Sequence, residues 1–425
     1  MAQIAVIGAG YVGLTSAAGL AALGHRVVCA DIDPDRVNAL RRGEIPIREL
    51  GMETLVRQGL ESGALRFVLG AAEASKESEF HFLCLQTPPR ADGAADLQFL
   101  LAAVREIAPV LQPRSVLVNK STVPGGTASV VQAAVDRDDV CVVSNPEFLR
   151  EGTAIDDFMH PDRVVVGSDA DHATARVAAL YAGMDAPILR TDAKSSELIK
   201  YASNAYLATK LTFVNEMAEV CEQVGADIDD VMLGMGQDRR IGTSYLQPGP
   251  GWGGSCFPKD TEALVHIAAQ VDCEFDFLRS VIALNHRHIE RVAAKVEKAV
   301  GGGLDNQRVA VWGLTFKAGT DDLRDSPAVA VSRLLIERGA QIVAFDPAVD
   351  EPPPQLPEVM VTTDPVEATR GAACLVILTE WDTFTKVDMA DVHAAMAAHA
   401  IVDARNVLDR EHATSLGFTI TGVGK

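Results

Sequence analysis

Residues 4–34 read IAVIGAGYVGLTSAAGLAALGHRVVCADIDP, and this stretch decides the fold class. A short apolar run is followed by a glycine turn, a helical segment of small residues and a second apolar run. The order strand, turn, helix, strand defines a βαβ unit, whose two strands lie parallel. Further apolar runs at 80–88, 115–124 and 140–148 alternate with segments of helical periodicity. The sequence therefore predicts an α/β fold with a doubly wound parallel sheet.

The turn in this unit carries a G-x-G-x-x-G pattern, which contains Gly8, Gly10, Tyr11, Val12 and Gly13. Such glycines allow the backbone to approach a pyrophosphate, which the N–H groups at the helix N-terminus attract. Asp31 ends the second strand about twenty residues further on, where a carboxylate accepts hydrogen bonds from ribose hydroxyls. The same carboxylate repels a 2′-phosphate and favours NAD over NADP, although Arg36 nearby weakens this preference. Glycines that serve only helix–sheet packing are the alternative.

The pattern changes after this first part of the chain. Residues 192–224 contain neither proline nor glycine, and apolar residues recur every three or four positions, which predicts one long helix. A second helical stretch is expected over 261–298. After 301–307 the order strand, helix, strand returns, with Gly313 alone where the first unit has three glycines. We therefore predict a nucleotide-binding domain over 1–192, a helical domain over 193–300 and a second α/β domain over 301–425.

Composition excludes several other classes of protein. The chain has 425 residues, of which 48% are hydrophobic and 23% charged, as in ordinary globular proteins. Its 38 basic and 58 acidic residues give a net charge of −20, which argues against nucleic acid or an anionic membrane as partner. The N-terminus lacks the basic region of a signal peptide, and the seven cysteines contain no C-x-x-C pair. We expect a cytoplasmic protein with reduced thiols, a small-molecule partner and no metal.

One loop of the helical domain, GPGWGGSCFPKDTEAL (249–264), carries the residues expected for covalent chemistry. Cys256 stands just before a helical run and three residues from Lys259. A helix N-terminus and a nearby lysine both favour the nucleophilic thiolate over the thiol. Asp260 or Thr261 is expected to cap this helix. An inert cysteine in a flexible loop is the alternative, whereas the other six cysteines lie in apolar contexts and are expected in cores.

Three further groups of polar residues are candidates for a ligand site. Lys200 and Asn204 are four residues apart on the long helix and therefore share a face, where they could bind a sugar oxygen and stabilise an alkoxide. Glu147 and Glu151 follow a strand end, where α/β sheets bind ligands and a general base would fit. Two threonines also follow strands: Thr87 and Thr122. Solvated side chains are the alternative for each group taken singly.

Together these motifs resemble those of the nucleotide-sugar dehydrogenases of the UDP-glucose/GDP-mannose dehydrogenase family. The likeness spans nearly the whole chain, in the order GAGYVG, QTP, KSTVP, NPEFLREGTAI, the long helix, GWGGSCFPKD, LTFKAGTDDLRDSP and DARN. Members of this family have a Rossmann-like NAD domain, a helical dimerising spacer and a second Rossmann-like domain for the sugar nucleotide. The resemblance therefore implies an NAD-dependent enzyme that forms a homodimer or a larger homo-oligomer.

The resemblance also implies the reaction, a four-electron oxidation of the C6 alcohol of UDP-glucose to UDP-glucuronate that produces two NADH. Cys256 would trap the aldehyde as a thiohemiacetal, and the thioester formed from it would be hydrolysed. Lys200 and Asn204 would stabilise the oxyanion, and Lys200 would help to remove the alcohol proton. The other catalytic residues would position or activate water: Glu147, Thr122 and Asp260.

Binding residues carry over from the same resemblance. Cofactor contacts beyond the glycine turn fall on Asp31, Arg36, Thr87, Thr122, Glu151, Lys259 and Arg324. Substrate contacts fall on Glu147, Phe148, Leu149, Arg150, Glu151, Lys200, Asn204, Tyr245, Leu246, Gln247, Pro248, Gly249, Gly253, Lys317 and Arg405. Arg240 looks like the residue that family members lend to the neighbouring subunit. Gln247 departs from the pattern, because some relatives carry lysine there.

Other readings stay open. The closest is a GDP-mannose or UDP-N-acetylhexosamine dehydrogenase, against which the R-I-G element at 240–242 favours UDP-glucose. A single-step dehydrogenase of the 3-hydroxyacid type shares the first domain and the long helix, and it needs no nucleophilic thiol. A non-catalytic NAD-binding sensor would bind the nucleotide without turnover.

Overall fold

The computed structural model describes residues 1–90 and 92–425, and its contacts divide the chain into two units. The first unit comprises 1–203 and 262–273, and the second comprises 204–261 and 274–425. The division falls within helix α9 (Ala193–Val224), the long helix predicted from the sequence. The division into three domains stays a prediction.

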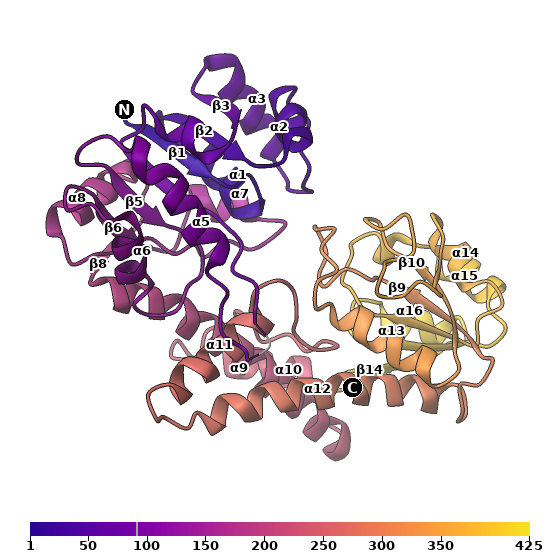
Figure 1. Ribbon diagram of the computed structural model, residues 1–425. Helices are drawn as coiled ribbons and strands as arrows, with labels where there is room; N and C mark the ends of the chain where they lie inside the picture. Colours follow the sequence, from indigo (N-terminus) through magenta and orange to yellow (C-terminus); the bar gives the residue numbers. More distant parts are fainter. Residues whose placement is uncertain (91) are drawn as a thin grey trace. The chain divides into compact units, whose positions relative to one another are not determined.

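The first unit is built on a sheet of eight described strands, with helices on both faces (Figure 1). The strand order is β3-β2-β1-β4-β5-β6-β7-β8. Neighbouring strands pair in parallel except β6 and β7, which meet antiparallel at Ser144 and Gly167. The predicted doubly wound sheet is confirmed, with this one antiparallel pair added. The strands are β1 (Gln3–Ile7), β2 (Arg26–Asp31), β3 (Leu65–Leu69), β4 (Phe80–Leu83), β5 (Val116–Asn119), β6 (Cys141–Ser144), β7 (Val164–Gly167) and β8 (Ile188–Thr191).

Strand β5 shows why helices must cover both faces. Val116 and Val118 belong to one hydrophobic core, and Leu117 between them belongs to another. Alternate strand residues point to opposite faces, so a strand that is apolar throughout must be covered on both sides. The helices of this unit, besides the first part of α9 and most of α11, are α1 (Tyr11–Ala22), α2 (Pro34–Arg41), α3 (Met52–Ser62), α4 (Ala71–Ser75), α5 (Gln98–Ile107), η1 (Ala108–Val110), α6 (Thr127–Val135), α7 (Ala154–Met159) and α8 (Asp171–Leu180).

The second unit contains a sheet of six described strands, all parallel, in the order β11-β10-β9-β12-β13-β14. This confirms the second α/β fold. The strands are β9 (Arg308–Trp312), β10 (Gln341–Phe345), β11 (Met360–Val361), β12 (Cys374–Ile377), β13 (Ala400–Asp403) and β14 (Thr419–Gly422). The helices beside them are α13 (Pro327–Glu337), α14 (Pro365–Thr369), η2 (Phe384–Lys386), α15 (Met389–Ala395) and α16 (Arg410–Ser415).

Helices from the middle of the chain share a core with this second sheet. Val214 of α9, Met232 of α10 (Ile228–Gly236) and Val292 of α12 (Asp276–Ala299) lie in one buried cluster with Val311 of β9. The common core explains why residues 204–261 and 274–425 form one unit, because burial of apolar surface is the main force that holds such elements together.

Two sequence predictions of element length are wrong in detail. The strands expected over 80–88, 115–124 and 140–148 end at Leu83, Asn119 and Ser144, and loops follow them. The helical stretch expected over 261–298 is two helices, α11 (Phe257–Ala269) and α12. Asp272 between them adopts φ 55°, a left-handed conformation that no helix continues through.

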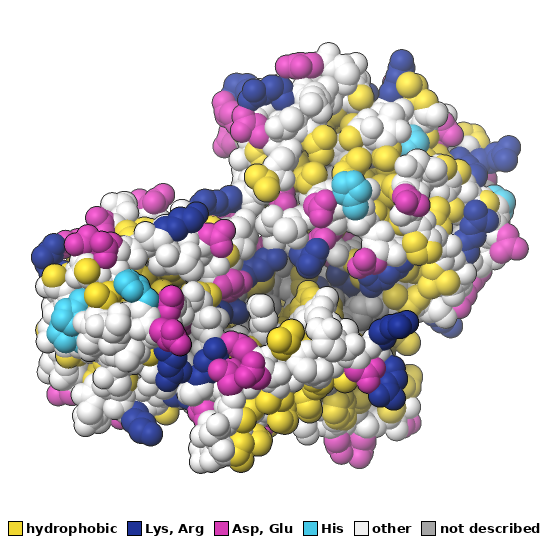
Figure 2. Space-filling view, turned by 180° about the vertical axis from the view of Figure 1, so that it is seen from behind, with side chains coloured by type: hydrophobic (Ala, Val, Ile, Leu, Met, Phe, Trp, Pro, Cys, Tyr) yellow, Lys and Arg dark blue, Asp and Glu magenta, His cyan; other side chains and the backbone are white. Residues whose placement is uncertain are grey.

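The surface carries both signs of charge despite the net charge of −20. Figure 2 shows basic and acidic side chains interspersed over the visible face. Within the residues that the structure describes, no helix is long and apolar enough to cross a membrane.

Candidate active site

The glycine turn after β1 has the geometry that a dinucleotide needs. Gly8 has φ +98°, and a Cβ atom there would lie 2.4 Å from the carbonyl oxygen of Cys84. A Cβ on Gly13 would lie 1.8 Å from the carbonyl oxygen of Gly8, so neither position admits a side chain. A Cβ on Gly10 would meet no atom within 4 Å, and no side chain caps α1 there. The helix N-terminus therefore opens onto space that a pyrophosphate can fill.

Asp31 lies at the end of β2, where the ribose was expected. Its Oδ2 accepts from the Ala9 N–H at 2.8 Å, and its Oδ1 accepts from the Asp33 N–H at 3.0 Å. The Arg36 guanidinium lies 3.4 Å from Oδ2. These contacts fix the orientation of the carboxylate. Each of its oxygens has two lone pairs, so the carboxylate can still accept hydrogen bonds from hydroxyl groups. The residues of this turn and strand end fit an NAD molecule.

The Tyr11 side chain has a structural partner that the sequence did not reveal. Its hydroxyl is hydrogen-bonded to the carboxylate of Glu49. Glu49 also accepts from the Gly152 N–H at 2.7 Å and from the Ala154 N–H at 2.8 Å. These backbone N–H groups at the start of α7 thereby gain a hydrogen-bond partner, which the helix itself does not provide. Glu49 thus ties the first turn of α1 to the segment after Glu151.

Two predicted threonines meet at neighbouring strand ends. The Thr87 hydroxyl donates to the Thr122 carbonyl oxygen at 2.8 Å, and both side chains are buried. Because β4 and β5 are adjacent parallel strands, their carboxyl ends lie side by side. The sequence identified both residues by this strand-end position.

Glu147 and Lys200 form a buried ion pair. Lys200 Nζ lies 2.9 Å from Glu147 Oε1, and the Leu149 N–H donates to Oε2 at 2.6 Å. Both residues are nearly inaccessible to solvent. Burial raises the pKa of Glu147, but the attraction and hydrogen bond of Lys200 outweigh it and lower the pKa below its ordinary value. The alternatives of an exposed carboxylate and a solvated lysine are therefore wrong.

Asn204, four residues after Lys200 on α9, pairs with Asp260. Its Nδ2 donates to Asp260 Oδ2 at 2.6 Å, and Lys259 is hydrogen-bonded to Oδ1. Asp260 lies within the first turn of α11, so the prediction that Asp260 or Thr261 caps this helix is wrong. The Thr261 hydroxyl instead donates back to the carbonyl of Phe257.

Cys256 lies immediately before α11, as the sequence predicted. Its carbonyl accepts from the Asp260 N–H at 3.0 Å, which starts the helix, and its Sγ lies 3.6 Å from the Ser255 hydroxyl. No disulfide joins any of the seven cysteines.

Side chains of α9 and α12 hold the glycine loop before Cys256. The Gly249 N–H donates to Asn215 at 3.0 Å, and the Gly249 carbonyl accepts from His288 at 2.7 Å. Asn285 exchanges two hydrogen bonds, each 2.9 Å, with the backbone of Trp252. The sequence did not predict that these three residues hold the loop, because nothing in the sequence shows which backbone group an Asn or His on a helix contacts.

The loop also lies against the second sheet domain of the same unit. A Cβ on Gly253 would lie 1.9 Å from the Asp325 carbonyl oxygen, and one on Gly249 would lie 2.8 Å from the Arg405 guanidinium. The Arg405 guanidinium donates to the carbonyls of Leu378 and Phe316. Four predicted substrate residues are thus gathered in one region: Gly249, Gly253, Lys317 and Arg405.

Other predicted residues lie apart from these groups or point elsewhere. Leu246 is buried in the hydrophobic core. The Arg240 and Arg324 side chains are exposed and pair with Asp238 and Asp322.

The Phe148 ring centroid lies 3.6 Å from the Arg163 guanidinium and 5.5 Å from Lys200 Nζ, and Arg150 pairs with Asp157. Tyr245 adopts φ 61°, a left-handed conformation that is uncommon for residues other than glycine. Of the remaining predicted residues, Glu151 is partly exposed, Gln247 is exposed and Pro248 is buried.

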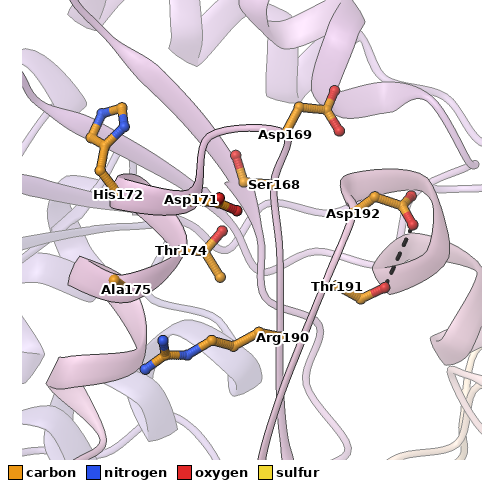
Figure 3. A pocket seen from close by; sticks show the side chains of 9 residues that line it. All are labelled: Ser168, Asp169, Asp171, His172, Thr174, Ala175, Arg190, Thr191 and Asp192. Atoms are coloured by element: carbon orange, nitrogen blue, oxygen red, sulfur yellow. Dashed lines mark hydrogen bonds between the residues drawn. The ribbon is translucent and has the colours of Figure 1, made fainter.

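A surface pocket of the first unit is separate from these residues (Figure 3). It is lined by Ser168, Asp169, Asp171, His172, Thr174, Ala175, Arg190, Thr191 and Asp192. Thr191 donates to Asp192 at 3.5 Å across its edge. It contains none of the predicted cofactor or substrate residues, so we do not include it in the candidate site.

The fold and the dinucleotide turn define the protein as an NAD-dependent oxidoreductase. Residues 2–185, 194–287 and 310–410 match the NAD binding, central and UDP binding domains of one family. The chain belongs to the UDP-glucose/GDP-mannose dehydrogenase family.

Individual relatives resemble the chain over its full length. A UDP-glucose 6-dehydrogenase of Rhizobium meliloti (strain 1021) is 44% identical, and the match covers 100% of this chain and 99% of the relative. The structure of a UDP-glucose dehydrogenase from Pyrobaculum islandicum has a TM-score of 0.90 at 37% identity and covers 100% of this chain and 98% of that one. The structure of a UDP-D-ManNAc dehydrogenase from Pyrococcus horikoshii has a TM-score of 0.88 at 26% identity, with 99% of each chain covered.

Proposed function

We propose that this protein oxidises the C6 alcohol of UDP-glucose to the carboxylate of UDP-glucuronate, with two NAD reduced per sugar. The observation that carries the proposal is Cys256, which stands at the end of a glycine loop and directly before α11. A nucleophilic thiol distinguishes an oxidation to the acid from one that stops at the aldehyde. Relatives named UDP-glucose 6-dehydrogenase, with identities of 44% and 40% over the full length, support the choice of sugar nucleotide.

Cys256 is the nucleophile in this scheme. Its thiolate adds to the aldehyde carbon and forms a thiohemiacetal, so the reactive aldehyde stays bound. Oxidation of the thiohemiacetal gives a thioester, and water then releases the acid and restores the thiol. NAD held at the glycine turn would supply the hydride acceptor for both oxidations.

Polar side chains stabilise the charges that develop during these steps. Lys200 and Asn204 donate to the C6 oxygen when it carries negative charge, and Lys200 takes the alcohol proton. Glu147, which is ionised and buried, positions water together with Thr122 and Asp260. The predicted cofactor and substrate residues given above complete the proposal as binding residues.

We extend the proposal to a homodimer. Tyr206, Phe213 and Val220 recur every seventh residue along α9, so they share one face, and their side chains are 64%, 49% and 49% exposed. An apolar stripe of this kind on a helix is typical of a protein–protein interface. Arg240 is the residue that one subunit would lend to its neighbour.

A UDP-N-acetylhexosamine is the second candidate substrate, because the Pyrococcus horikoshii UDP-D-ManNAc dehydrogenase is close to this chain in structure. GDP-mannose is the third, through the family.

The test is the amount of NADH formed at completion, with UDP-glucose limiting and NAD in excess. About two NADH per sugar supports the substrate and the covalent scheme together. About one per sugar means that oxidation stops at the aldehyde, which contradicts the role of Cys256. No NADH contradicts the substrate, and UDP-N-acetylhexosamines and GDP-mannose are then compared in the same assay.

A further inference from the structure

The sheet domain of the second unit carries a turn with the same local geometry as the dinucleotide turn of the first unit. Gly313 directly follows β9 and has φ +94°, close to the +98° of Gly8. The Leu314 N–H donates to Asp346 Oδ2 at 2.7 Å, as the N–H group after Gly8 donates to Asp31 Oδ2 at 2.8 Å. Asp346 is therefore the counterpart of Asp31, the carboxylate expected to bind a ribose.

The Asp346 carboxylate is already occupied by donors from the protein. Its Oδ2 accepts from the N–H groups of Leu314 and Thr315, from the Thr315 hydroxyl at 3.0 Å and from Trp381 Nε1 at 3.2 Å. Its Oδ1 accepts from the Ala348 N–H at 2.8 Å, and only 3% of the residue is exposed. A carboxylate oxygen has two lone pairs, so these donors leave Oδ2 no place for a ligand. Asp346 thus holds the chain itself rather than a ribose.

The part of the chain that Asp346 holds has no counterpart in the first unit. There α1 follows the glycine turn directly, whereas α13 begins only at Pro327. Residues 314–326, which lie between turn and helix, are called the inserted segment below. The Ser326 hydroxyl donates to the Leu314 carbonyl at 2.7 Å, so the two ends of the segment meet. Asp346 binds the N–H group of the same Leu314 and therefore anchors the segment at its base.

The inserted segment packs against groups of the candidate site. A Cβ on Gly254, two residues before Cys256, would lie 2.7 Å from the Phe316 ring. The Gly254 N–H donates to the Asp325 carbonyl at 3.4 Å, and Asp325 has φ 46°. A left-handed conformation costs free energy in a residue other than glycine and persists where the surrounding structure imposes it. The Phe316 carbonyl accepts from the Arg405 guanidinium at 3.2 Å.

We propose that Asp346 is a positioning residue, which holds the inserted segment so that the segment fixes the glycine loop before Cys256 and the guanidinium of Arg405. That these two groups meet the sugar nucleotide rests on the proposed function. Loss of a buried acceptor leaves its donors without partners, so the base of the segment would loosen. A carboxylate that only stabilised the sheet domain would have no effect on the glycine loop.

Asp346→Asn tests this inference, because an amide keeps the size of the side chain but turns one acceptor oxygen into a donor. Hydrogen exchange of the full chain without ligands, followed by mass spectrometry, reports local opening. Peptides that cover 314–326 and 250–256 should both exchange about tenfold faster, the effect of one net hydrogen bond on a local equilibrium. Peptides that cover the glycine turn at 8–13 should exchange as in the wild type.

Asp364→Asn is the matched control. Asp364 is a carboxylate of the same sheet domain that also holds the backbone, since it accepts from the N–H groups of Val366 and Glu367 at the start of α14. The control should speed exchange in α14 and leave 250–256 unchanged. Faster exchange confined to 314–326 in Asp346→Asn, or an equal change over 250–256 in Asp364→Asn, overturns the inference.

Phe316→Ala interrupts the same connection beyond Asp346. Phe316 is partly exposed, and the substitution removes the ring from Gly254 without changing a donor to Asp346. Exchange over 250–256 should rise as in Asp346→Asn, while the N–H groups of Leu314 and Thr315 stay protected. The double variant should exchange no faster over 250–256 than Asp346→Asn, because both changes act through one contact. Additive effects would mean that Asp346 does not act through the inserted segment.

Steady-state kinetics test the consequence for the reaction. Asp346→Asn and Phe316→Ala should each raise KM for UDP-glucose by about tenfold and leave KM for NAD within about twofold. A merely structural Asp346 would lower the thermal midpoint and move neither KM, and that result overturns its role toward the substrate. If the wild type oxidises no sugar nucleotide, the proposed function fails, and the exchange measurements alone decide whether Asp346 positions the glycine loop.

Discussion

The Asn204 amide donates to the Asp260 carboxylate at 2.6 Å, so a residue of α9 is fixed by the first turn of α11. Both side chains are buried, and Lys259 is hydrogen-bonded to the other carboxylate oxygen of Asp260. Because a carboxylate only accepts, the NH₂ group of Asn204 must face it, which fixes the orientation of the whole amide. Asp260 therefore holds the amide of Asn204 in one orientation.

Asp260→Asn tests this relationship. The substitution keeps the shape of the side chain, removes the anion that binds Lys259 and lets the Asn204 amide turn over. If Asn204 stabilises the developing oxyanion, kcat should fall by about 10²-fold, as for the loss of one donor in an oxyanion hole, with little change in KM. Steady-state kinetics with UDP-glucose measure both constants.

Asp276→Asn, at an exposed position in the first turn of α12, is the control and should match the wild type. A rise in KM with kcat unchanged would assign Asn204 to ground-state binding instead.

Cys256→Ser tests the covalent scheme. A serine hydroxyl is far less ionised than a thiol, so the variant should lose conversion to the acid by at least about 10³-fold, the scale seen when a nucleophile is removed. The affinity for NAD, measured by calorimetry, should stay within about twofold, because the dinucleotide turn is remote in sequence and unchanged. Cys273→Ser, at an exposed cysteine after α11, is the matched control and should leave the two-NADH stoichiometry intact. Wild-type yields of acid from Cys256→Ser would eliminate the thioester.

Gly10→Ala separates folding from cofactor binding at the dinucleotide turn. Gly10 has φ −76°, which alanine adopts readily, and its Cβ would meet no atom of the protein within 4 Å. The thermal midpoint should therefore stay near that of the wild type. The methyl group would occupy space over the α1 N-terminus, so the Kd for NAD should rise about tenfold or more. Gly234→Ala, which also meets nothing within 4 Å, is the control and should bind NAD normally. Unchanged NAD binding in Gly10→Ala would place the pyrophosphate elsewhere.

Local patterns explain why much of the fold was predictable. The βαβ unit from β1 to Asp31 is recognisable because its glycine spacing and both of its strands lie within one short stretch of sequence. The long helix α9 is recognisable because its apolar residues recur at helical spacing without interruption. Strand ends were overestimated, because the chain stays buried beyond the last strand residue: Cys84, Lys120 and Asn145, which directly follow β4, β5 and β6, are all buried. Asp272 shows the limit in a helix, since it adopts φ 55° although no glycine or proline marks the break between α11 and α12.

The sequence predicted which residues belong to the candidate site, but it did not predict which residues they contact. Lys200 and Asn204 were expected on one helix face, and both are buried there. The partner of Lys200 is Glu147, far away in the sequence, for which the sequence left both a general base and an exposed carboxylate open. Only the tertiary structure brings such charges together.

Glu197 provides a prediction about stability and pH. This residue of α9 is buried and accepts from the N–H groups of Gly126, at 2.5 Å, and Ala128, at 2.8 Å, at the start of α6. Burial raises the pKa of Glu197 to about 7, and these hydrogen bonds only partly offset it. The folded protein therefore holds a proton between about pH 4.5 and about pH 7 that the unfolded chain has lost. The contribution of Glu197 to the free energy of unfolding is thus largest below about pH 4.5 and is lost as the pH rises to about 7.

Glu197→Gln removes this titration, because an amide stays neutral at every pH. We measure the free energy of unfolding by urea denaturation at about pH 5 and at about pH 8. It should decrease between these pH values in both proteins, and the decrease should be smaller in the variant by on the order of 1–2 kcal/mol. The comparison between the two proteins cancels the titration of every other carboxylate that they share. Glu77→Gln, at an exposed glutamate of the same unit, is the control and should reproduce the wild-type pH dependence. A variant whose free energy differs from the wild type by the same amount at both pH values would show that Glu197 stays ionised in the folded protein. Its contacts with α6 would then act as a cap of constant strength, since the charged form would hold both N–H groups across the whole range.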